Sequence, residues 1–165
     1  MKKFIEQLPK AELHVHLEGT LEPELLFELA ERNSVELPYS TPAEVVEAYD
    51  FHDLPSFLAI YYKAMEVLRT EQDFYDLAMQ YFERAAVQNV VYVEPFFDPQ
   101  AHTSRGVDFG TVVEGIHAAQ VDAAEKLGVQ SNLIMCFLRD MSADSAQLHL
   151  QMAEPYLDWI IGVHL

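Results

Sequence analysis

The hydrophobic positions along the chain follow two periods, one typical of buried strands and the other of amphipathic helices. Four short apolar runs are expected to form strands, because a parallel strand that is buried on both faces is almost continuously apolar. These runs span residues 11–17, 90–97, 132–138 and 159–165. Pro95 lacks a backbone N–H, so we expect it to end the hydrogen bonding of the second run.

Between these runs, apolar residues recur at every third or fourth position, which predicts helices with one buried face. Thr70 and Asp73 resemble a capping box in which Asp replaces the usual Glu, and Gly128 stands where a left-handed helix cap is expected. The expected helices span residues 21–32, 43–49, 108–126 and 142–153, with two more that begin at Pro55 and after Thr70.

The strands and helices alternate, which indicates an α/β fold with a parallel sheet and right-handed crossovers. The first crossover contains several helices, and a connection of that size often carries a lid or a specificity element. Four strands form either a small open sheet or half of an eight-stranded barrel. The last apolar run would leave an unpaired edge, so we expect residues 1–165 to be a single domain that is a fragment of a longer protein.

Composition narrows the classes of partner. Half of the 165 residues are hydrophobic and the formal net charge is −17, which disfavours nucleic acid and anionic membranes as partners. We see neither a secretory signal nor an apolar run long enough for a membrane span, and we expect a cytoplasmic protein. Cys136 is the single cysteine. It has no intrachain disulfide partner, and we expect it to be a small buried residue.

The strongest candidate chemistry lies in the first strand. His14 and His16 are separated by one residue. Because side chains alternate along a strand, both imidazoles point to the same face and are suited to hold a transition metal such as Zn²⁺. The alternative is a pair of histidines that only form hydrogen bonds with neighbouring groups.

Four segments together resemble the adenosine/adenine deaminase family of metal-dependent hydrolases. Residues 18–23 (Glu-Gly-Thr-Leu-Glu-Pro) and 94–99 (Glu-Pro-Phe-Phe-Asp-Pro) resemble its adenine deaminase branch in particular. The four matching segments are residues 8–24 around the two histidines, 54–58, 90–94 and 137–139.

The resemblance implies a TIM-type (β/α)8 barrel, of which this chain carries the first four strands. It also implies zinc bound by His14 and His16 at the barrel mouth, with the remaining ligands and the catalytic residues beyond Leu165. The implied reaction is hydrolytic deamination of adenine to hypoxanthine and ammonia in purine salvage, in which zinc lowers the pKa of bound water towards about 7. The 165-residue chain alone is then expected to be inactive.

The resemblance leaves several roles open. Glu18 is either a residue that discriminates between substrates or a surface glutamate beside Gly19. Leu54, Phe57, Leu58 and Tyr61 form either an apolar lid over a purine or ordinary core. The substrate is adenine, adenosine or an N6-substituted adenine, and a non-catalytic half-barrel that binds a partner is the alternative from another class.

The remaining polar residues are expected to be structural or solvated. A buried Glu94 needs a partner such as Arg139, whereas Asp98 and Asp140 are weak site candidates near strand ends. His164 stands where a small residue is common in the family. Four histidines without paired spacing are expected to be solvated or half-buried, namely His52, His102, His117 and His149.

Overall fold

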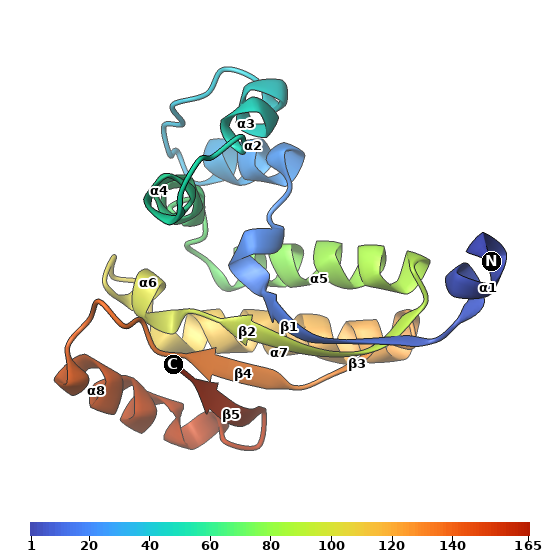
Figure 1. Cartoon of the computed structure of the whole chain (residues 1–165). Coiled ribbons are helices and arrows are strands. Elements are labelled where there is room, and N and C mark those ends of the chain that lie inside the picture. The colour runs from blue at the N-terminus through green and yellow to red at the C-terminus, as the bar shows by residue number, and fades with distance from the viewer.

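The computed structural model describes all residues 1–165 and contains one parallel sheet flanked by helices (Figure 1). Its strands lie in the order β1-β2-β4-β5, and the short β3 pairs with β2. The four expected strands are therefore confirmed, and their ends differ from the expected ones by at most two residues. The strands are β1 (Lys10–His16), β2 (Val90–Phe97), β3 (Gln130–Ser131), β4 (Leu133–Cys136) and β5 (Ile160–His164).

The expected end of the second strand at Pro95 is wrong. Pro95 pairs with Val15 of β1, and β2 continues through Phe96 and Phe97, which pair with Ile134 and Met135 of β4. A proline lacks only the donor of its own peptide unit, so the flanking residues sustain the ladder on both sides.

Helices fill every crossover, and the first crossover contains the four expected helices, preceded by the short η1 that the sequence did not predict. Helices α1 and α6 were not expected from the sequence. The helical elements are α1 (Lys2–Gln7), η1 (Leu17–Thr20), α2 (Pro23–Arg32), α3 (Pro42–Ala48), α4 (Leu54–Met65), α5 (Glu71–Val87), α6 (Pro99–Thr103), α7 (Phe109–Lys126), α8 (Ala143–Ala153) and η2 (Glu154–Tyr156). None of them is both long and apolar enough to cross a bilayer.

Local capping sets several of these helix ends. The Thr70 side chain accepts from the backbone N–H of Asp73, and the Asp73 carboxylate accepts from the backbone N–H of Thr70, so the expected capping box is confirmed. Asp53 and Ser56 form a second capping box at the start of α4. Gly128 has φ of +72°, the left-handed conformation expected after α7.

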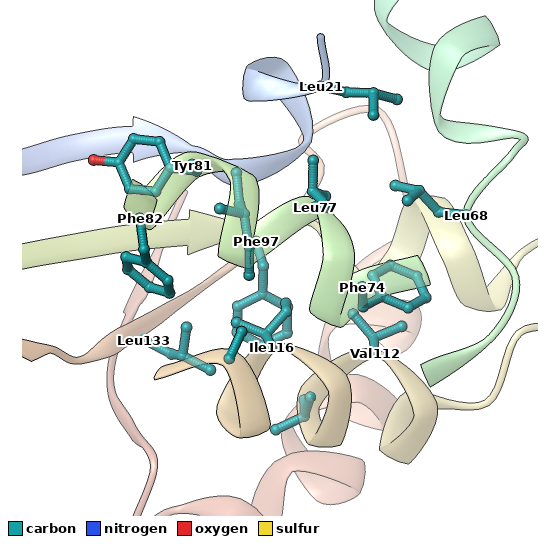
Figure 2. Packing of buried hydrophobic residues seen from close by; sticks show 14 of the residues in the cluster. Leu21, Leu68, Phe74, Leu77, Tyr81, Phe82, Phe97, Val112, Ile116 and Leu133 are labelled. Carbon is teal, nitrogen blue, oxygen red and sulfur yellow. The ribbon is translucent and has the colours of Figure 1, made fainter. Parts of the chain in front are cut away.

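The main core lies between the sheet and the helices α5 and α7 (Figure 2). Phe74 and Leu77 of α5 meet Ile116 of α7, while Phe97 and Leu133 reach the same cluster from the sheet. This core holds β1 and β2 side by side. Because the two strands are parallel, their carboxyl ends lie next to each other at the same end of the sheet.

Candidate active site

His14 and His16 lie at the carboxyl end of β1 and line the same pocket, which has a volume of about 780 Å³. Their ring centroids are 5.8 Å apart, and Phe96 at the end of β2 stacks against both rings. The alternation expected in β1 therefore places the two imidazoles on one face. A volume of this size falls within the range of small-molecule sites, about 300–1,000 Å³.

Helix α4 forms one wall of this pocket. Leu54, Phe57, Leu58 and Tyr61 all line it, as do the two histidines. Leu54 is 67% exposed and Tyr61 only 8%, so the apolar wall is open to solvent at one end and buried at the other. Tyr61 also forms a small buried cluster with Met65 and Ala101, against which Phe57 and Leu58 pack, so this face of α4 lines the cavity and belongs to a core cluster at once.

Glu18 does not line the pocket, and it is not the surface glutamate of the alternative interpretation. The strand ends at His16, and Glu18 lies in η1 with only 3% of its surface exposed. Its Oε1 accepts hydrogen bonds from the backbone N–H of Asp98 at 2.9 Å and from His102 Nε2 at 3.0 Å. The alternation of side chains along a strand therefore does not extend to this residue.

Behind Glu18 lies a polar network that the sequence did not indicate. Arg105 donates to Nδ1 of His102 at 2.8 Å and to the carbonyl oxygens of Met65 and Ala101. Because Nδ1 accepts this bond, Nε2 carries the proton that His102 donates to Glu18. His102 is fully buried, so the expectation that it is solvated or half-buried is wrong. The Glu-His-Arg set comes from η1 and from the α6 region, and its spacing carries no sequence signal.

The buried carboxylate that lines the pocket belongs to Asp98, directly after β2. Burial opposes its ionisation, but contacts with His16, Tyr61 and the Cys136 thiol outweigh burial and hold the pKa of Asp98 below its usual range. The contact with Asp98 in turn raises the pKa of His16. Burial raises the pKa of Cys136, and nearby Asp98 and Glu18 add to that shift, so Cys136 is a buried thiol as expected.

The donor set fits a zinc ion held by His14 and His16. Zinc binds imidazole nitrogen at about 2.0–2.1 Å, and two rings with centroids 5.8 Å apart on one face are able to reach a common ion. His16, Asp98 and Cys136 form another close group of potential ligand atoms. That group shares His16 with the first, and its Asp98 carboxylate already accepts a hydrogen bond from Tyr61.

Three other polar residues discussed in the sequence analysis lie in or near the pocket, and one expected pair does not form. Glu94 accepts from Tyr92 at 2.8 Å, and Arg139 donates to the carbonyl oxygen of Leu165, so the expected Glu94–Arg139 pair is wrong. His164 lines the pocket with its ring centroid 5.3 Å from that of His14, and Asp140 also lines it.

The other unpaired histidines lie outside the pocket. His149 is buried, so the expectation that it is solvated or half-buried is wrong. Its Nδ1 donates to the carbonyl oxygen of Ser145, and its Nε2 accepts from the Thr103 hydroxyl. His117 is half-buried against Trp159, and His52 is exposed, as expected for both.

Comparison with known proteins gives the family. The sequence profile described as "Adenosine deaminase" matches residues 9–164. An adenine deaminase from Vibrio parahaemolyticus is 56% identical over all 165 residues, which correspond to 49% of that protein. The chain thus spans about half the length of such relatives.

Solved structures agree with this assignment. The crystal structure of an adenine deaminase from Arthrobacter aurescens superposes with a TM-score of 0.90 at 52% identity, covering 94% of this chain and 47% of that one. An amidohydrolase from Burkholderia ambifaria with bound Zn has a TM-score of 0.86 at 24% identity, covering 98% and 45%, and this likeness shows the fold alone. The expected TIM-type barrel architecture, with these strands as its first four, is confirmed. The chain therefore belongs to the adenosine deaminase family.

Proposed function

We propose that the full-length protein is a zinc-dependent adenine deaminase, which hydrolyses adenine to hypoxanthine and ammonia. The observation that carries this proposal is the pair of imidazoles in a pocket that apolar side chains of α4 also line. Its high identity to adenine deaminases favours this branch of the family. We also infer a role in purine salvage, a cytoplasmic location and a small purine base as the substrate.

In this proposal, His14 and His16 provide two of the four ligands of a zinc ion. Bound zinc supplies Lewis-acid activation of a water molecule. The Burkholderia ambifaria amidohydrolase, which has the same fold, contains zinc and supports this choice of metal.

Leu54, Phe57, Leu58 and Tyr61 serve as the lid in this proposal. They contact the flat faces of the base and exclude water from it. Glu18 influences substrate choice indirectly, because it fixes the backbone of Asp98 at the base of the pocket.

We further propose that residues 1–165 are the N-terminal half of a barrel. Relatives are about twice as long, and apolar side chains at both edges of the sheet are solvent-exposed, namely Leu13 on β1 and Ile161 and Val163 on β5. An uncovered apolar edge favours association with further strands and helices. The remaining zinc ligands and the catalytic residues then belong to the second half.

Steady-state kinetics of the full-length protein test the function. We expect ammonia release with the highest kcat/KM on adenine, lower values on adenosine and N6-methyladenine, and no turnover by the 165-residue chain with added Zn²⁺. A higher kcat/KM on either of the other two substrates would contradict the assigned substrate. Absence of ammonia from all three would contradict the deaminase itself.

A further inference from the structure

Asp98 faces the candidate zinc ligand His16 from the side opposite to solvent. The carboxylate Oδ2 lies 3.5 Å from His16 Nδ1 and accepts a hydrogen bond from the Tyr61 hydroxyl at 2.8 Å. The side chain of Asp98 is 4% exposed. A carboxylate so deeply buried is costly unless other groups pair with it, so its position depends on these contacts.

The backbone of Asp98 is fixed as firmly as its side chain. Its N–H donates to Glu18 Oε1, and Glu18 is held in turn by His102 and Arg105. Arg105 is anchored on the carbonyl oxygens at the end of α4. The carboxylate that meets His16 is therefore held by η1, α4 and α6 together, and a shift of any one of them would move it.

Nδ1 is the nitrogen of His16 that faces Asp98, at 3.5 Å, which is a close contact but longer than a normal hydrogen bond. An ionised carboxylate only accepts hydrogen bonds, so this contact favours the neutral form of His16 that carries its proton on Nδ1. Nε2 then keeps its lone pair, which is the form that binds a metal. Carboxylates that orient metal-binding histidines in this way are common, and their loss weakens metal binding.

We propose that Asp98 is a positioning residue, which selects the tautomer of His16 and fixes the direction of its ring for metal binding. This inference rests on the proposed function, because it takes His16 as a zinc ligand. It also assigns Glu18, the carboxylate singled out by the sequence, to the support of Asp98.

Zinc affinity of the full-length protein tests the proposal, measured by competition with a chromophoric chelator. Asp98→Asn is expected to weaken zinc binding by about 10- to 100-fold, and Tyr61→Phe by less, because it removes one of the contacts. Tyr75 of α5 and Asp122 of α7 provide a matched control. The Tyr75 hydroxyl donates to the Asp122 carboxylate at 2.6 Å, and neither residue lines the pocket. Tyr75→Phe and Asp122→Asn are expected to leave zinc affinity unchanged.

Nitrogen NMR of the metal-free wild-type protein provides a second test that needs no variant to fold. At about pH 9, where imidazole is neutral, we expect the proton of His16 on Nδ1. A proton on Nε2 would overturn the proposal, as would an unchanged zinc affinity in a folded Asp98→Asn variant.

The two proposals fail in different ways. If the wild-type protein binds zinc and deaminates adenine but Asp98→Asn binds zinc equally well, only the positioning role is wrong. If the wild-type protein neither binds zinc nor releases ammonia, the proposed function is wrong and the positioning role falls with it.

Discussion

Glu18 accepts a hydrogen bond from the backbone N–H of Asp98 at 2.9 Å, which joins the end of β1 to the end of β2. The two residues are 80 positions apart in the sequence. Their contact holds the two strand ends together at the pocket, because Asp98 directly follows β2 and Glu18 lies two residues after β1, and the two strands are paired in register.

Substitution of Glu18 separates its hydrogen-bonding role from its charge. Glu18→Ala leaves the Asp98 N–H and His102 Nε2–H without acceptors, and we expect the free energy of unfolding to fall by about 2–4 kcal/mol. Glu18→Gln keeps an acceptor oxygen, so a smaller loss is expected. Urea denaturation of the full-length protein measures both, and equal losses for the two variants would contradict the role of the acceptor.

Asp73 is expected to make stability depend on pH. Burial opposes its ionisation, but hydrogen bonds from Thr70, Arg69, Asn33 and Arg32 outweigh burial and lower its pKa. The stabilisation is therefore complete above the unfolded carboxyl pKa of about 3.9 and is lost as pH falls through the lower folded pKa. Near pH 7, Asp73→Asn is expected to cost about 2–3 kcal/mol.

The pH dependence of that cost is the decisive measurement for Asp73. The difference in unfolding free energy between wild type and Asp73→Asn is expected to narrow as pH is lowered from about 6 to about 3. A difference that stays constant over this range would show that the charge of Asp73 contributes nothing.

Gly115 permits the close approach of α7 to α5. A Cβ at this position would lie 2.3 Å from the carbonyl oxygen of Glu71 and 2.9 Å from Cβ of Phe74. Gly115→Ala is expected to destabilise the protein by about 1–3 kcal/mol, because the helices must separate. Gly162→Ala is the control, since nothing lies within 4 Å of its Cβ position, and equal losses in thermal unfolding would contradict this packing.

Phe57 tests the lid. Its ring lies 5.6 Å from that of Tyr61 and faces the pocket. In the full-length protein, Phe57→Ala is expected to lower kcat/KM for adenine about tenfold, equivalent to about 1.4 kcal/mol. Phe4→Ala, on the exposed helix α1, is the control. Unchanged kinetics for Phe57→Ala would mean that this wall of the pocket does not contact the substrate.

Much of the fold could be predicted from the sequence because it depends on local patterns. The apolar run of β2, the capping box at Thr70 and the left-handed Gly128 each depend on residues adjacent in the chain. The expected end of β2 at Pro95 is wrong, because β1 and β4 pair with β2 on its two sides and this pairing continues past the proline.

The site was predictable only in part, for a related reason. The pair His14 and His16 follows from strand alternation alone. The contacts of Asp98 and His102 arise where the ends of two strands meet α6, and no local pattern encodes such a meeting. The sequence therefore favours Glu18 as the functional carboxylate and makes Asp98 and Asp140 only weak candidates, whereas Asp98 and Asp140 line the pocket and Glu18 does not.

Zinc content of the full-length protein, measured by mass spectrometry after purification, tests the central claim most directly. We expect one zinc per chain in the wild type and in His52→Ala, which alters an exposed histidine outside the pocket. A variant with both His14→Ala and His16→Ala is expected to retain its fold and to contain almost no zinc. Full zinc content in that double variant would contradict the claim that these two imidazoles hold the metal.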